Sequence, residues 1–76
     1  MVHAFIMVKA STGGAEALSE RIGTLEHVTD VKVVAGDFDL IIETEADEMY
    51  EIINSVATKI RGFDEIEDTK TYVCLE

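Results

Sequence analysis

Apolar and polar positions alternate from the start of the chain, a period typical of a β-strand. The stretch 2–9 (VHAFIMVK) is rich in β-branched and aromatic residues and contains no breaker. Its alternation places Val2, Ala4, Ile6 and Val8 on one face, and His3, Phe5, Met7 and Lys9 on the other. Because both faces carry apolar groups, we expect both faces of this strand to be covered.

Two later segments have apolar residues at helical spacing. The first follows the break at 11–14, where Thr12 or Gly13 is the expected N-cap, and its apolar positions are Ala15, Leu18, Ile22 and Leu25. The second is expected to begin at Thr44, with Asp47 three residues later, and to end at Gly62. Its apolar positions are Met49, Ile52, Ile53, Val56, Ala57 and Ile60.

Three further strands complete the pattern. We expect strands over 28–35 and 40–43, joined as a hairpin by the turn Gly36-Asp37-Phe38-Asp39, and a last strand over 66–75. The apolar run from Leu40 to Ile42 does not alternate, which indicates a strand inside the sheet. The order strand, helix, strand, strand, helix, strand predicts one α+β domain over 1–76, with the ferredoxin-like βαββαβ fold. Right-handed crossovers then place two helices on one face of a four-stranded antiparallel sheet.

The uncovered face of that sheet predicts self-association. A chain of 76 residues is near the lower limit of independent stability, and small domains need a disulfide, a metal or a partner. Cys74 is the only cysteine, so no internal disulfide can form, and we expect a buried, inert thiol. We therefore expect a homodimer that packs sheet against sheet as a dimeric αβ barrel. No signal peptide or membrane span is visible, and an unpaired thiol fits the cytoplasm.

The net charge of the chain limits the kinds of molecule that it can bind. Sixteen acidic residues against six basic ones give a formal net charge of -10. Such a surface repels phosphate backbones, so direct nucleic-acid binding is not expected. The acidic side chains form either an ordinary solvated face or an adaptation to high salt, as in a halophilic protein.

Several stretches together resemble the effector-binding domain of the Lrp/AsnC family: AFIMVKAS, VTDVKVVAGDFDLIIETEA and RGFDEIEDTKTYVCL. The resemblance covers essentially the whole chain. Its most specific part is the Gly-x-aromatic-Asp turn at 36–39, which leads directly into Leu40-Ile41-Ile42, and the second marker is Asp68-Thr69-Lys70-Thr71. Met1 stands almost at the first strand, so the chain looks like the stand-alone form without the helix-turn-helix. The family's Pro-Gly before strands two and four is replaced by Glu26-His27 and Arg61-Gly62-Phe63.

The resemblance implies a function as well as a fold. It implies dimers through the sheets, rings of dimers, and effector pockets between neighbouring dimers, near the Gly-x-x-Asp turn. The implied effector is a small molecule, an amino acid above all. The implied role is to modulate transcription, together with a DNA-binding Lrp/AsnC paralogue, without enzymatic activity. We expect neither a cofactor nor a metal site.

The turn residues Gly36, Asp37, Phe38 and Asp39 are the predicted ligand site. Gly36 would permit close backbone approach, Asp39 could pair with an amino group, and turn amides could hold a carboxylate. Thr69 and Thr71 share one face of the last strand and could bind ligand or a neighbouring subunit. The alternatives are that 36–39 merely makes a good turn and that threonine is simply a good strand residue.

A small enzyme of the dimeric ferredoxin-like barrel type, a cofactor-free monooxygenase or isomerase, is the alternative function. It would need a polar constellation in a cavity. The chain offers only His3, Tyr50 and Tyr72, with no convincing base–orienter pair. We expect surface or structural histidines and packed tyrosines. A purely structural interaction domain is the third possibility.

Overall fold

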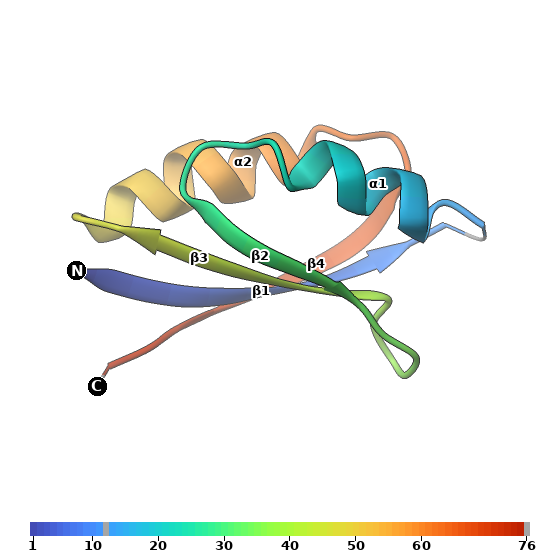
Figure 1. Ribbon diagram of the computed structural model, residues 1–76, viewed down its shortest axis with the longest axis horizontal. Coiled ribbons are helices and arrows are strands. Elements are labelled where there is room, and N and C mark those ends of the chain that lie inside the picture. The colour runs from blue at the N-terminus through green and yellow to red at the C-terminus, as the bar shows by residue number, and fades with distance from the viewer. Residues whose placement is uncertain (12, 76) are drawn as a thin grey trace.

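The computed structural model describes residues 1–11 and 13–75, and its element order is the predicted one. The elements are β1 (Val2–Ala10), α1 (Ala15–Ile22), β2 (Val28–Val33), β3 (Leu40–Ala46), η1 (Glu51–Ala57), α2 (Thr58–Arg61) and β4 (Ile66–Val73). The segment η1 is π-helical and runs directly into α2, so the two form one continuous second helix (Figure 1).

The four strands form one antiparallel sheet in the order β2-β3-β1-β4. Both helices lie on one face of this sheet, and none of the described elements lies on the other face (Figure 1). The α+β, ferredoxin-like prediction is therefore confirmed. The uncovered side is called the open face below, and the loop between β2 and β3 projects toward it (Figure 1).

The core lies between the helices and the sheet. On β1 the predicted alternation is confirmed, because Ala4, Ile6 and Val8 are buried under the helices. Phe5 and Met7 therefore belong to the open face. The core is completed by side chains from both helices and from β3: Leu18, Ile22, Leu40, Ile42, Ile52, Val56 and Ile60. Burying each of these large side chains contributes about 1.5–3 kcal/mol relative to leaving it exposed.

The predicted start of the second helix is wrong. Thr44 lies inside β3, where its buried hydroxyl donates a hydrogen bond to the carbonyl of Ala4 at 3.0 Å. The strand continues to Ala46, three residues beyond its predicted end, because threonine fits a strand as well as a cap. The helix is held at its start by Glu51, whose carboxylate accepts the backbone N–H of Glu48 at 3.0 Å.

The apolar stripe of the second helix is narrower than predicted. Ile52, Val56, Ala57 and Ile60 are buried, whereas Met49 and Ile53 are 45% and 40% exposed. A π-helical turn contains more residues than an α-helical turn, so residues at α-helical spacing do not all stay on the inner face. The helix ends at Gly62 as predicted, with Lys59 and Arg61 in its last turn.

The turns that flank α1 use two residues with positive φ. Gly13 has φ +80° in the connection from β1, a conformation that glycine adopts without strain. The N-cap of α1 is Gly14, one residue after the predicted Gly13, and it provides no side-chain cap. The alternative N-cap, Thr12, lies outside the described residues. His27 has φ 74°, at the place where the Lrp/AsnC resemblance leads one to expect the glycine of Pro-Gly.

Two predictions of burial are corrected within the single chain. Cys74 follows the end of β4 and is exposed, not buried. Ile41 is only half-buried, because it belongs to the open face of β3, although Leu40 and Ile42 on either side of it are fully buried. None of the helices within the described residues is long and apolar enough to cross a bilayer.

Candidate functional site

Asp39 is fixed at the junction of three strands. Its backbone N–H donates to the carbonyl of Val8 at 2.9 Å, and its own carbonyl accepts the N–H of Val34 at 2.8 Å. Its side-chain Oδ2 accepts the backbone N–H of Ala10 at 2.9 Å, beside the register shift between Lys9 and Ala10. Two backbone hydrogen bonds fix the position of the residue and one holds its carboxylate, which is what a preorganised binding group requires.

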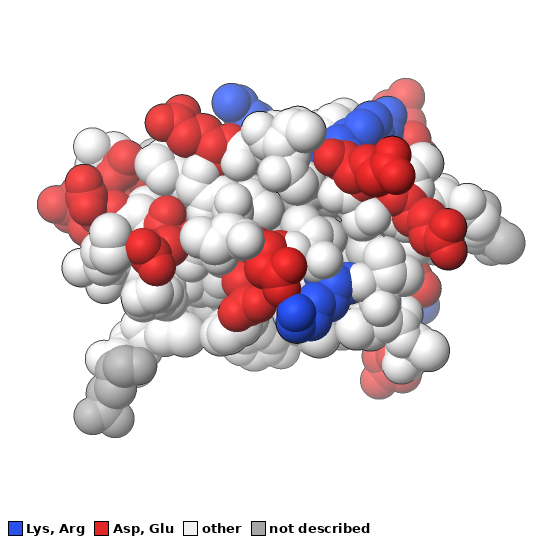
Figure 2. Space-filling model, viewed as in Figure 1, with Lys and Arg blue, Asp and Glu red and all other residues white. Residues whose placement is uncertain are grey.

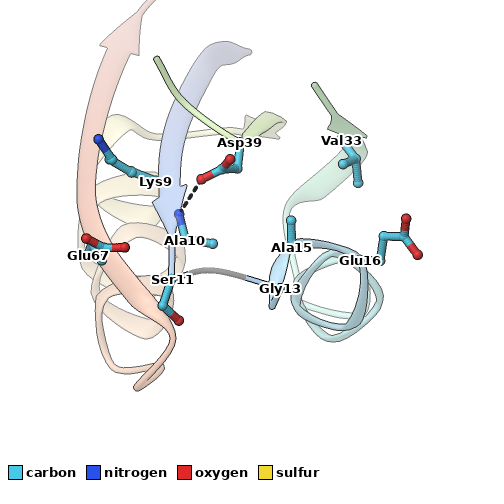
Figure 3. A pocket seen from close by; sticks show the side chains of 9 residues that line it. All are labelled: Lys9, Ala10, Ser11, Gly13, Ala15, Glu16, Val33, Asp39 and Glu67. Carbon is cyan, nitrogen blue, oxygen red and sulfur yellow. Dashed lines mark hydrogen bonds between the residues drawn. The ribbon is translucent and has the colours of Figure 1, made fainter. Parts of the chain in front are cut away.

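This carboxylate lines an open hollow of about 690 Å³ between the end of β1 and the start of α1. The Asp39 hollow is lined by Lys9, Ala10, Ser11, Gly13, Ala15, Glu16, Val33, Asp39 and Glu67. Figure 3 shows Asp39 near its centre, with Lys9 and Glu67 on the side of β1 and β4. Ala15, Glu16 and Val33 lie on the opposite side. The hollow is large enough for an amino acid and offers charged groups and small apolar side chains.

The positive end of α1 also belongs to this hollow. The first N–H groups of any α-helix have no intrahelical carbonyl partner, and they carry partial positive charge. In α1 the N-cap residue satisfies none of them with a side chain. Gly13 and Ala15 line the hollow on either side of that N-cap, so the backbone amides at the start of α1 are close to the space that Asp39 lines.

The structure brings together only part of the predicted site. Of the predicted residues, Asp39 lines the hollow, while Gly36 and Asp37 are exposed in the same turn and do not. Gly36 has no positive φ, and an added Cβ would meet nothing within 4 Å, so the turn itself does not require a glycine there. The close approach of a ligand to Gly36 stays a prediction. The role of the turn as a ligand site stays a prediction.

Phe38, Thr69 and Thr71 lie elsewhere. The ring of Phe38 has the ammonium of Lys70 at 5.8 Å, a cation–π contact between the β2–β3 loop and β4. Thr69 and Thr71 are paired with Val8 and Ile6 on the neighbouring strand, and neither is among the described residues that line the Asp39 hollow. Their assignment to the ligand also stays a prediction.

Four polar residues of the hollow were missed by sequence reasoning: Lys9, Ser11, Glu16 and Glu67. They come from three separate segments, which meet only because β1 lies between β3 and β4 and because α1 starts beside the end of β1. The one usable signal was Glu16, an acid in the first helical turn. That signal indicates helix stabilisation rather than a ligand.

A second hollow, of about 490 Å³, lies between α1 and the edge strand β2. Its hydroxyl groups are already engaged: those of Ser19, Thr24 and Thr29 donate to the backbone carbonyls of Glu16, Arg21 and Glu43. Since those donors serve the fold, this hollow has less to offer a polar ligand than the Asp39 hollow.

Each histidine has a carboxylate neighbour, which the sequence did not reveal. His3 Nδ1 lies 3.4 Å from Glu45 Oε2, and His27 Nε2 lies 3.4 Å from Glu51 Oε2. Neither pair lines either hollow described above. Tyr50 and Tyr72, which we expected to be packed, are 62% and 57% exposed. Neither tyrosine is among the described residues that line the two hollows.

Ion pairs on the surface perturb two carboxylates. The hydrogen bond from Lys32 holds the pKa of Asp30 below its usual value, and the same contact raises the pKa of Lys32. The hydrogen bond from Arg21, at 2.5 Å, lowers the pKa of the Glu65 carboxyl. Acidic side chains are spread over the face seen in Figure 2, and the basic side chains form no continuous patch there.

The element order and the strand order define the fold class, a small ferredoxin-like α+β domain. The chain matches the model of the Lrp/AsnC ligand binding domain over residues 3–76, so it belongs to this family. The suspected Lrp/AsnC membership is thereby confirmed.

Known relatives agree with this assignment. The leucine-responsive regulatory protein of Haemophilus influenzae is 29% identical over 70 residues, which are 92% of this chain but only 42% of that protein. The chain thus spans less than half the length of this relative. Among solved structures, a hypothetical protein from Pyrococcus horikoshii is 30% identical, with a TM-score of 0.90. The superposition covers 100% of this chain and 92% of the Pyrococcus chain. A protein from Thermus thermophilus is 26% identical with a TM-score of 0.92, over 100% of this chain and 95% of its own.

Proposed function

We propose that this domain is an amino-acid sensor, that the Asp39 hollow is its effector site, and that it is not an enzyme. The observation that carries the proposal is the carboxylate of Asp39. One of its oxygens is held by the N–H of Ala10, while Oδ1 accepts no hydrogen bond from any other described residue. A carboxylate can accept several hydrogen bonds, so Oδ1 is free to receive a ligand ammonium group.

The other half of an amino acid is a carboxylate, and the start of α1 provides for it. The backbone amides of the first turn of α1, which begins at Ala15, receive no side-chain cap and are suited to an anion at the positive end of the helix. A carboxylate there and an ammonium at Asp39 would account for both charged groups of a free amino acid. The name of the Haemophilus influenzae relative, a leucine-responsive regulator, supports an amino acid as the class of effector.

The second part of the proposal is assembly. We infer a homodimer through the open face, because Phe5 and Met7 belong to this face by the alternation of β1 and none of the described elements covers it. Rings of such dimers are what the family resemblance implies. With a formal net charge of -10 the domain would not bind DNA itself. It would modulate transcription through a DNA-binding Lrp/AsnC paralogue in the cytoplasm.

A thermal-shift screen of the purified protein against all twenty amino acids tests the effector site. A ligand of the folded state raises stability by about 2.7 kcal/mol at a hundredfold excess over its Kd. Asp39→Asn should abolish the shift, because the amide keeps an acceptor for Ala10 but loses the negative charge. Asp37→Asn makes the same change two residues away, outside the hollow, and should leave the shift intact. No shift with any amino acid, or equal loss in both variants, would refute the proposed site.

Light scattering of a matched pair of variants tests the dimer. Phe5 on the open face and Ile53 on the outer surface of the second helix are similarly exposed, at 37% and 40%. Phe5→Lys should convert the dimer to a monomer at micromolar concentration, since it buries an unpaired charge in the interface. Ile53→Lys should leave the dimer intact. A wild-type protein that is already monomeric would contradict this part of the proposal.

A further inference from the structure

Three apolar side chains are exposed at neighbouring positions near the start of the second helix. They belong to Met49, Tyr50 and Ile53, and we call them the helix patch. Because residues three and four positions apart are neighbours on a helix surface, Ile53 adjoins both of the others. Single exposed apolar residues are ordinary on a protein surface, whereas a group of adjacent ones marks an interaction site.

The backbone of the second helix explains why this patch faces solvent. Ile53 and Ile60 are spaced at i and i+7, which puts both on one face of an α-helix. In the structure Ile60 is buried and Ile53 is not, because Ile53 belongs to the π-helical segment η1. Such segments are rare and occur frequently at functional sites. The irregular backbone thus leaves on the surface an isoleucine that α-helical geometry would turn toward the core.

The charged side chains that precede the helix patch are negative. Asp47 and Glu48 are exposed, and neither forms an ion pair with another described residue. The sequence contains no Lys or Arg over 33–58. Figure 2 shows acidic side chains and no basic ones at the end of the molecule where the second helix begins. An occupant of this surface therefore has to bring positive charge.

The same observations disfavour three other kinds of occupant. A second copy of the chain would bring like charges together, and a nucleic acid would be repelled by the carboxylates. A small molecule needs a hollow, and neither hollow described above is lined by a residue from 47–53. We propose that the helix patch is a docking surface for a basic amphipathic segment of another protein. Its apolar stripe covers the patch, and its Lys or Arg side chains pair with Asp47 and Glu48.

The helix patch and the Asp39 hollow lie at opposite ends of the sheet (Figure 1). The second helix follows the end of β3, whereas the hollow lies where β1 ends and α1 starts. A partner docked on the patch consequently leaves the hollow open. The docking surface is thus independent of amino-acid sensing, and either can fail without the other.

Fluorescence anisotropy of labelled peptides with the full chain, at an ionic strength of about 0.15 M, tests the proposal. The probe is a synthetic peptide of Leu and Lys whose Leu residues recur at i, i+3, i+4 and i+7, so that its helix has one apolar and one basic face. Two matched peptides have Glu in place of every Lys, or Ser in place of every Leu. We expect the Leu–Lys peptide to bind, and both matched peptides to bind at least about tenfold more weakly. Equal binding of the Leu–Lys and Ser–Lys peptides, or no binding, overturns the proposal.

Substitution of apolar residues locates the binding on the chain. Tyr50→Ser should weaken the Leu–Lys peptide about fivefold, because the peptide loses an apolar surface to cover. Leu75→Ser, a change of an exposed apolar residue beyond the end of β4, should leave the affinity as in the wild type. An affinity that Tyr50→Ser does not change would place the peptide elsewhere and overturn the proposal.

Substitution of acidic residues separates local pairing from attraction by net charge. The double change Asp47→Asn with Glu48→Gln should weaken the Leu–Lys peptide about fivefold. Glu20→Gln with Asp64→Asn removes two exposed carboxylates from other parts of the surface and should have little effect. Equal weakening by the two double variants would mean that net charge alone holds the peptide, which contradicts the proposal.

Light scattering at one protein concentration identifies a second copy as the occupant. The mass of the Tyr50→Ser assembly should equal that of the wild type, and a lower mass would mean that another copy covers the patch, against the proposal. The thermal shift with amino acids should be the same in Tyr50→Ser and wild type. A variant that loses only the amino-acid shift would contradict the independence of the two sites.

Discussion

The hydrogen bond from Ala10 to Asp39 allows a quantitative prediction of how substitutions at Asp39 change the free energy of unfolding. Ala10 is 6% exposed, and its N–H donates to the Asp39 side chain at 2.9 Å. Asp39→Ala leaves this buried donor without its acceptor, which costs about 1–3 kcal/mol. Asp39→Asn retains an oxygen in the same place and loses only the assistance of the negative charge. We therefore expect Asn to be more stable than Ala at this position by about 1 kcal/mol.

Urea unfolding at one fixed protein concentration measures the difference. The slope m for a small domain is at least about 1 kcal/mol/M, so the midpoint of Asp39→Ala should fall below that of Asp39→Asn by up to about 1 M. The slope itself should not change, because neither variant alters the surface that unfolding exposes. Asp37→Ala, an exposed neighbour, serves as the control. Identical midpoints for Asp39→Ala and Asp39→Asn would refute the structural role assigned to the hydrogen bond.

Three further predictions concern stability. Gly36→Ala should stabilise the protein by about 0.4–1 kcal/mol, because its φ is not positive and the added methyl group meets no atom; a loss of stability in urea would contradict this. The lowered pKa of Glu65 means that its ion pair with Arg21 stabilises the fold above the unfolded pKa and loses this effect as the pH falls through the folded pKa. The Tm difference between wild type and Glu65→Gln should therefore vanish in acid, and a difference independent of pH would disprove the link. Molar salt should raise the Tm of the wild type, since it screens the repulsion within a chain of net charge -10, whereas an unchanged Tm would rule out adaptation to high salt.

The strands were predictable because their signals are local. The alternation around Ile6 predicts β1, and the hairpin turn before Leu40 predicts the start of β3. In both cases residues nearby in the sequence are enough for the prediction. The second helix was predicted less accurately, because a π-helical segment cannot be read from apolar spacing, and Thr44 satisfies the preferences of both a cap and a strand. Of the residues predicted to bind a ligand, only Asp39 lines the hollow, and its role there stays a prediction. The partners of Asp39, such as Glu67, reach it through the order of strands in space, which no local pattern contains.

The central position of β1 has a consequence for folding during synthesis. Ile6 is paired with Ile42 on one side and with Thr71 on the other, so β1, the first of the four strands to be synthesised, has partners that leave the ribosome much later. Pairings so distant along the chain slow folding, because a long loop must close before the contact forms. Until β4 has emerged, β1 keeps one edge of unpaired backbone groups beside an incomplete core. The nascent chain is then most prone to aggregate, and its folding is completed only as the last strand is released.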